Sequence, residues 1–323
     1  MTTLSAHLKS WHPDRPVSKG ATAYHNAVVN ASWHIENINE LIKIVSKKIK
    51  DNSIVVDFGA GTGSSSLYLL QTAKVKFKLW LVDNSASWLS KAYELFSRYQ
   101  NVNFFLLEKI NNSYTTLAEA IGEGVADHVV SANTVHLIPN LEETFKGINR
   151  ALKQKGCFTF QSGNIIRRDR EEGILMIDDT VKILHDIALK IIRTNKKFAK
   201  YRKNLGESVE TASQRKLIFP DPRPIEIYLK MLKAAGFEYN APHHKLIKVK
   251  YKDWLDFIRV KRLQAGILPE LGGKETTPEE EQDRDELITL ASKKMFKELE
   301  TRPFADNKSF TAEWVYLTAT KER

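Results

Sequence analysis

A short apolar run that ends in a glycine-rich turn is the feature that most constrains how this chain folds. Residues 53–58 read Ser-Ile-Val-Val-Asp-Phe, and glycines follow as Gly59, Gly61 and Gly63. An almost continuous apolar run of this length is typical of a strand that is buried on both faces. Glycine allows the backbone to adopt positive φ angles and to approach a ligand closely. The turn therefore indicates a ligand site between a buried strand and the helix that follows.

The same alternation of strand and helix continues to about residue 161. Apolar runs and helical spacing predict strands at residues 53–58, 77–82, 102–107, 126–132 and 156–161, and helices at 33–50, 64–74, 87–99, 114–121 and 141–152. Five successive strand-then-helix units favour a parallel sheet with right-handed crossovers and helices on both faces. We therefore predict an α/β fold of the doubly wound class.

The second half of the chain departs from this alternation. Its spacing predicts helices at residues 174–193, 225–235, 251–268 and 279–299, and strands at 246–251 and 310–320, which bring the sheet to seven strands. Long insertions usually have a function. We divide the chain into an N-terminal lid segment (1–34), a core (35–164), a mostly helical insertion that covers the substrate (165–242) and a C-terminal part that completes the sheet (243–323).

Composition excludes some classes of protein. The net charge is +10, from 49 Lys and Arg against 39 Asp and Glu, but the basic residues interleave with apolar ones as on a solvated outer face. No stretch reaches the roughly 18 apolar residues of a membrane span, and residues 1–16 hold no signal-peptide core. We expect a cytoplasmic protein with no membrane partner. The single cysteine, Cys157, excludes an internal disulfide and a cysteine-based zinc cluster, and we expect no metal.

Two classes of ligand use a glycine turn of this kind, dinucleotides and S-adenosylmethionine. The dinucleotide fingerprint has its third glycine where this chain has Ser64. Asp57, two residues before the first glycine, would repel a pyrophosphate but suits the ammonium and sulfonium of S-adenosylmethionine. Asp83 ends the second predicted strand, where a carboxylate can accept hydrogen bonds from the ribose hydroxyls of either ligand.

Four segments resemble the motifs of class I S-adenosylmethionine-dependent methyltransferases. Residues 57–63, Asp-Phe-Gly-Ala-Gly-Thr-Gly, resemble motif I, residues 81–85 the second motif and residues 104–108 the third-strand motif. Residues 126–139 resemble the fourth-strand motif of the small-molecule branch, which ubiquinone-biosynthesis methyltransferases typify. The resemblance extends over residues 35–161 and is only general beyond them. It implies a Rossmann-like core that binds S-adenosylmethionine and releases S-adenosylhomocysteine.

The resemblance also implies a set of cofactor-binding residues at the glycine turn and at the strand ends: Asp57, Gly59, Ala60, Gly61, Gly63, Asp83, Asn84, Trp88, Glu108, Asn133 and Thr134. Asp83 would hold the ribose, Trp88 would pack against the adenine and Glu108 would meet its amino group. Asn133 and Thr134 would border the methyl group. Trp88 as an ordinary core residue and Glu108 as a surface carboxylate are the alternatives.

The catalytic and substrate-binding residues are less strongly marked. His136 is a candidate general base because an imidazole titrates near neutral pH, with a structural role as the alternative. Trp11, Tyr24, Trp33 and His34 are candidates for an aromatic substrate pocket. We expect in-line displacement at the sulfonium methyl by an O or N atom of a small molecule, a secondary metabolite.

Two other functions fit the same core. The net charge favours a nucleic-acid methyltransferase, but residues 133–136, Asn-Thr-Val-His, lack the Pro-Pro-aromatic sequence of the amino-methylating enzymes. Cys157 begins a core strand instead of standing in the proline-cysteine motif of the cytosine-C5 enzymes. The second alternative is a non-catalytic protein that binds S-adenosylmethionine. We expect a small-molecule partner and no nucleic acid, and the sequence leaves the oligomeric state open.

Overall fold

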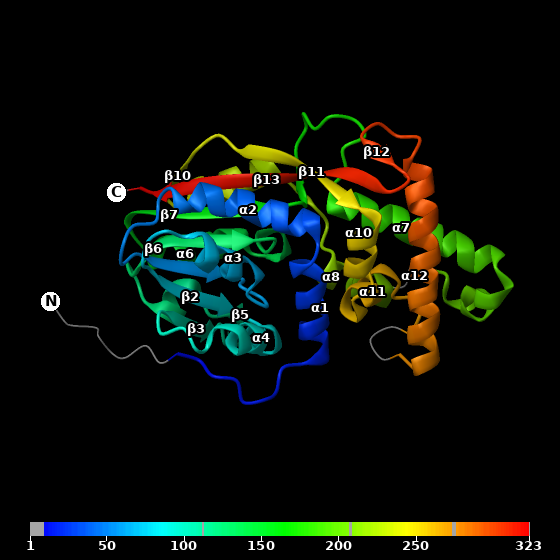
Figure 1. Ribbon diagram of the computed structural model, residues 1–323, viewed down its shortest axis with the longest axis horizontal. Helices are drawn as coiled ribbons and strands as arrows, with labels where there is room; N and C mark the ends of the chain where they lie inside the picture. Colours follow the sequence, from blue (N-terminus) through cyan, green and yellow to red (C-terminus); the bar gives the residue numbers. More distant parts are fainter. Residues whose placement is uncertain (1–9, 112, 207–208, 273–275, 323) are drawn as a thin grey trace.

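A central sheet with helices on both faces occupies one side of the molecule, and a mainly helical region occupies the other (Figure 1). The structure, a computed structural model, describes residues 10–111, 113–206, 209–272 and 276–322. Within these residues the sheet has nine strands. No helix in the same ranges is both long enough and apolar enough to cross a membrane.

Five parallel strands form the centre of the sheet, in the order β7-β6-β1-β2-β3. They are β1 (Ile54–Phe58), β2 (Lys78–Asp83), β3 (Val102–Leu106), β6 (Ala126–Ala132) and β7 (Leu152–Ser162). The predicted doubly wound α/β fold with a mostly parallel sheet is confirmed. Because the strands are parallel, the carboxyl ends of β1, β2 and β6 meet at one edge of the sheet.

The long strand β13 (Ser309–Lys321) runs antiparallel beside β7 and extends beyond it. Its last residues pair with β10 (Phe237–Tyr239), while its first eight pair with β11 (His243–Lys250). Two residues of β12 (Ala305–Asp306) also pair with it. Residues 309–314 of β13 have no partner in β7. This part of β13 and its partner β11 extend from the central sheet towards the helical region.

Helices cover both faces of the sheet, and each face has its own apolar core. Neighbouring residues of β6 divide between them, with Val130 in one core and Val129 in the other, as the alternation of a strand requires. One face is covered by α2 (Ser32–Ser46), α3 (Ser64–Thr72) and α4 (Ala86–Phe96), and the other by α5 (Leu117–Ile121), α6 (Leu141–Ala151) and α9 (Ile225–Ala234).

The helical region is built from two separate segments of the chain, and its helices pack in pairs, α7 on α12 and α8 on α11. Its members are α7 (Ile177–Thr194), the 3-10 helix η2 (Lys196–Asn204), α8 (Val209–Ile218), α10 (Tyr251–Ile258), α11 (Lys261–Ile267) and α12 (Pro278–Leu299). Helix α1 (Lys19–Val29) lies between this region and the sheet (Figure 1). Residues 243–323 therefore supply helices to this region as well as strands to the sheet.

Three local features differ from the sequence prediction. The helix expected at 251–268 is divided into α10 and α11, because Val260 is extended and Gln264 donates its side-chain amide to the carbonyl oxygen of Arg259. The helix expected at 114–121 begins at Leu117, since β4 (Lys109–Ile110) and β5 (Ser113–Tyr114) form a hairpin before it. Short strands β8 (Ile165–Ile166) and β9 (Arg223–Pro224) pair beyond the sheet.

Helix α2 begins against the helical region. Asp253 on α10 accepts hydrogen bonds from the backbone N–H of Ser32, at 2.9 Å, and from its hydroxyl, at 2.5 Å. The first N–H groups of a helix have no partner within the helix, and its N-terminus favours a negative charge. The Asp253 carboxylate therefore stabilises the start of α2 and fixes it to α10.

We expect Asp253→Ala to lower the free energy of unfolding by about 1 kcal/mol, because it removes this cap. Asp256→Ala is the matched control, since Asp256 lies on the same helix and forms an exposed ion pair with Lys252. That control should change the free energy by less than about 0.5 kcal/mol. Urea unfolding of both variants measures the difference, and equal unfolding midpoints would contradict the capping role.

Candidate functional site

The glycine turn lies where β1 ends, pressed against two neighbouring strands. The N–H groups of Gly59 and Ala60 both donate to the carbonyl oxygen of Val82 on β2, at 2.8 and 3.0 Å. Gly59 has a φ of 73°, and a Cβ on it would lie 2.2 Å from Cγ2 of Thr134, which follows β6. A side chain cannot fit there, so glycine is required both for the backbone angle and for the packing.

Asp83 holds the turn from the end of β2. One carboxylate oxygen accepts from the N–H of Gly61 at 2.8 Å, and the other accepts from the N–H of Ser85 at 2.8 Å. Burial raises the pKa of Asp83, and the backbone hydrogen bonds oppose this rise. Each oxygen of a carboxylate has a second acceptor position, so Asp83 can take further donors.

Asp57, on β1, has one carboxylate oxygen without a partner. Oδ2 accepts from the hydroxyls of Ser65 and Ser66, both at 2.7 Å, while Oδ1 is buried and has no hydrogen-bond partner among the described residues. Burial raises the pKa of Asp57 to about 6, against the effect of the two serines. A cation with N–H donors would satisfy Oδ1 and favour the charged form. The residue therefore fits the ammonium group of S-adenosylmethionine.

The chain turns sharply after β6 and brings Asn133 and Thr134 next to the glycine turn. Asn133 has a φ of 50°, and its N–H donates to the carbonyl oxygen of Gln161 on β7 at 3.0 Å. Its side-chain oxygen accepts from the indole N–H of Trp314 at 3.3 Å. The Thr134 hydroxyl donates to the carbonyl oxygen of Gly59, 3.1 Å away.

His136 lies in the 3-10 turn η1 (Val135–Leu137), which follows directly. Its Nδ1 is 2.9 Å from the hydroxyl of Ser162 at the end of β7. Burial and the nearby Arg223 lower the pKa of His136 to about 4, so the imidazole is neutral at pH 7. Arg223 donates to the carbonyl oxygens of residues 135, 136 and 138, and these bonds fix the turn.

Trp88 and Tyr24 meet above the glycine turn. Their ring centroids are 4.3 Å apart, and Trp88 lies 3.6 Å from the position of a Cβ on Gly61. Burial raises the pKa of Tyr24 to about 12. The guanidinium of Arg262, on α11, lies 5.3 Å from the Trp88 ring centroid. Three separate elements, α1, α4 and α11, therefore converge at this point.

Two histidines from the N-terminal helices contact the turn and the start of α3. The Nε2 atom of His34, on α2, lies 3.2 Å from the hydroxyl of Ser64, and burial lowers the pKa of His34 to about 4. His25 on α1 lies 3.1 Å from the hydroxyl of Thr62, and burial lowers its pKa as well. His25 was not among the predicted residues, because a single histidine on a helix carries no motif.

The remaining predicted residues lie further out or in the core. Asn84 and Glu108 are exposed, at the ends of the neighbouring strands β2 and β3. Trp11 donates its backbone N–H to the carbonyl oxygen of Phe104 on β3 at 2.7 Å. Trp33 is buried and stacks on Trp314 with ring centroids 5.6 Å apart.

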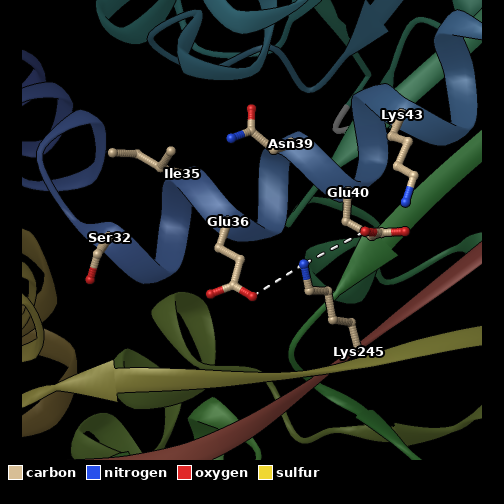
Figure 2. Close-up of a pocket in the computed structure, with 7 residues that line it drawn as sticks. All are labelled: Ser32, Ile35, Glu36, Asn39, Glu40, Lys43 and Lys245. Carbon is tan, nitrogen blue, oxygen red and sulfur yellow. Dashed lines mark ion pairs between the residues drawn. The ribbon is translucent and has the colours of Figure 1, made fainter.

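Two surface hollows lie away from this site. The first, of about 410 Å³, lies between α2 and β11, where Lys245 forms ion pairs with Glu36 and Glu40 (Figure 2). The second, of about 550 Å³, lies between α1 and α10. None of the predicted site residues lines either hollow. In the ranges that the structure describes, no group of three or more His, Cys, Asp or Glu side chains could hold a metal ion.

The family comparison decides the class of protein. Residues 49–236, more than half of the chain, match the family model described as a methyltransferase domain. The chain belongs to this methyltransferase family. The predicted enzyme class is confirmed, and S-adenosylmethionine as the methyl donor agrees with it. The ubiquinone-biosynthesis branch is not confirmed by the match and stays a prediction.

The curated relatives of this methyltransferase are much longer proteins. A highly reducing polyketide synthase, calA, of Penicillium decumbens is 28% identical over 110 residues, which are 34% of this chain and 4% of the synthase. The lovastatin nonaketide synthase mokA of Monascus pilosus is 28% identical over 103 residues, 32% of this chain and 3% of the synthase. The chain thus spans only a small part of the length of these relatives.

Solved structures are similar to this methyltransferase at low identity. The YcgJ protein from Bacillus subtilis is 14% identical and has a TM-score of 0.50. The superposition covers 88% of this chain and 99% of the YcgJ chain. Haemonchus contortus phosphoethanolamine N-methyltransferase 2, in complex with S-adenosyl-L-methionine, is 16% identical with a TM-score of 0.49. That superposition covers 94% of this chain and 57% of the other.

We expect Gly59→Ala to destabilise the fold more than Gly124→Ala. Both glycines have positive φ, but a Cβ on Gly124 meets nothing within 4 Å, whereas one on Gly59 overlaps Thr134. The difference in the free energy of unfolding should be about 1–3 kcal/mol, the usual cost of overpacking. Chemical denaturation measures it, and an equal loss in both variants would contradict the close packing of the turn.

Proposed function

We propose that this methyltransferase transfers the methyl group of S-adenosylmethionine to an O or N atom of a small molecule, a secondary metabolite. The observation that carries the proposal is the unpaired, buried Oδ1 of Asp57 beside a turn that only glycine can form. A buried acceptor without a partner is costly, and a cationic ligand with N–H donors removes that cost.

The donor lies across the carboxyl ends of β1, β2 and β6. Asp57 accepts from its ammonium and Asp83 from its ribose hydroxyls. The turn, formed by Gly59, Ala60, Gly61 and Gly63, allows the backbone to approach the ligand. Asn84, Trp88 and Glu108 surround the adenine. Asn133 and Thr134 border the methyl group.

The protein contributes positioning and exclusion of water more than strong acid–base chemistry. His136 is the proposed general base: its Nδ1 lies 2.9 Å from the Ser162 hydroxyl, and in the tautomer that is protonated at Nδ1 the Nε2 atom can accept a proton. A pKa of about 4 makes this imidazole a weak base. The proposal therefore favours an acceptor that is already ionised or a neutral amine, whose attack depends on alignment with the sulfonium methyl.

The surrounding segments supply the substrate pocket. Trp11, Tyr24, Trp33 and His34 line it from residues 1–34, and the helical insertion at 165–242 covers it. The polyketide synthases among the relatives support a secondary metabolite as substrate, because their names place them in polyketide synthesis. A cytoplasmic location and a lack of nucleic-acid partners belong to the same proposal.

Methyl-labelled S-adenosylmethionine tests the function directly. The enzyme is incubated with a small-metabolite extract and, separately, with total RNA, alongside an Asp83→Ala variant. We expect label in the metabolite pool, lost by at least tenfold in the variant, and the product then reveals whether the acceptor is O, N or C. Label in the RNA instead would show a nucleic-acid methyltransferase. The net charge of +10 favours that alternative. Donor binding without transfer to either pool would favour the non-catalytic alternative.

The affinity for S-adenosylhomocysteine should depend on pH through Asp57. The ligand's ammonium binds the carboxylate form, and the pKa of Asp57 is raised to about 6. Affinity should therefore be nearly constant above about pH 7 and fall about tenfold between pH 7 and pH 5, as the carboxylate takes up a proton. Calorimetry at each pH measures this fall.

Asp57→Asn should bind more weakly and lose that pH dependence. Asp83→Asn is the matched control, because it also weakens binding but leaves Asp57 to titrate. An affinity of the wild-type protein that stays level from pH 5 to pH 7 would contradict the role of Asp57.

A further inference from the structure

Gln161 stands out because its side chain is fully buried and both atoms of its amide lack a hydrogen-bond partner among the residues described. Buried amides nearly always have a partner, and leaving one without costs about 1–3 kcal/mol. The residue is the second last of β7, at the same edge of the sheet as the glycine turn. An unpaired amide in this position lowers the stability of the fold, and a ligand that binds the amide explains why it is there.

The side chains around Gln161 can be placed by the strand register. Gln161 pairs with Tyr316 of β13, two residues beyond the pair in which the hydroxyls of Thr159 and Thr318 lie 3.1 Å apart. Because side chains alternate along a strand, these four residues share one face of the sheet. Tyr316 donates its hydroxyl to the side-chain oxygen of Asn37, on α2, at 3.0 Å. Gln161 therefore lies beneath the first half of α2.

Asn37, the hydrogen-bond partner of Tyr316, adds a second unpaired group on the same face of the sheet. It is fully buried, and its amide nitrogen has no hydrogen-bond partner in the part of the chain that the structure covers. The two side chains together offer N–H donors from both amides and one unpaired acceptor, the oxygen of Gln161. This is the complement of a planar group with a C=O beside an N–H.

The group is close to the place proposed for the methyl. Asn133 follows β6, and its backbone N–H donates to the carbonyl oxygen of Gln161 at 3.0 Å. The next residue of β13 on the same face, Trp314, donates its indole N–H to the side chain of Asn133. Trp314 stacks on Trp33, the neighbour of His34 on α2. The two amides thus lie on the far side of Asn133 from the glycine turn.

We propose that Gln161, with Asn37, binds the methyl acceptor, and that the acceptor presents a carboxamide or lactam group to them. The inference rests on the proposed function, since it names the substrate class of the same site. The acceptor's C=O takes N–H bonds from both amides, and its N–H donates to the oxygen of Gln161. Helix α2 carries Asn37 and lies over this face of the sheet.

A pair of small probes tests the proposal on the full chain saturated with S-adenosylhomocysteine. The probes are 2-pyridone, a planar lactam, and N-methyl-2-pyridone, which has the same ring without the N–H. NMR titration of the side-chain amide signals gives a dissociation constant for each. We expect 2-pyridone to bind at least tenfold more tightly, and Gln161→Met to abolish that preference. Equal affinities in the wild-type protein, or a preference that survives in the variant, would overturn the proposal.

Thr159→Val is the matched control, because Thr159 lies on the same strand and face but has Thr318 as its partner. It should keep the preference for 2-pyridone and unfold at a lower urea concentration. Gln161→Met should unfold at an equal or higher concentration, since it removes an unpaired buried amide. A lower midpoint for Gln161→Met would show that the amide has a structural partner and would count against the proposal.

Binding of S-adenosylhomocysteine separates this inference from the proposed function. If the wild-type protein binds S-adenosylhomocysteine but does not distinguish the two probes, only the inference about Gln161 fails. If it does not bind S-adenosylhomocysteine, the proposed function fails, and the inference fails with it.

Discussion

The close packing of the glycine turn against the ends of β2 and β6 is the contact on which the whole site depends. Gly59 has no room for a Cβ beside Thr134, and Gly61 is held by Asp83. Both contacts require β1 to lie between β2 and β6, which is the order of the parallel sheet. Motif and fold therefore support each other, because a different strand order would separate the turn from its partners.

The sequence predicted the parts of the structure that depend on local pattern and strand order. Asp57 and Asp83 lie 26 positions apart in the sequence, but they stand near the ends of two strands that pair in parallel. The alternation of strands and helices was therefore enough to predict that both residues lie at the same edge of the sheet. The contacts of Trp314, Gln161 and Asn37 could not be predicted in this way. These contacts depend on the antiparallel pairing of β13 and on the position of α2 over it, and no pattern in the sequence indicates either arrangement.

Several buried polar groups without hydrogen-bond partners among the described residues lie at this site, and each is unfavourable for stability alone. The free oxygen of Asp57 suits a cation, while the amides of Asn37 and Gln161 suit a neutral polar group. The two kinds of group stand on opposite sides of Asn133, where the proposed function places the methyl. We therefore propose that donor and acceptor are recognised by different chemistry and that the protein's main contribution to catalysis is to align them.

The most direct test of the account is a crystal structure of the protein with S-adenosylhomocysteine bound. In that structure we expect the ligand's ammonium within hydrogen-bond distance of Asp57 Oδ1, its ribose hydroxyls on Asp83, and its sulfur next to Asn133. A ligand bound elsewhere on the molecule, or one whose ammonium and ribose contact neither carboxylate, would contradict the assignment of the glycine turn as the methyl-donor site.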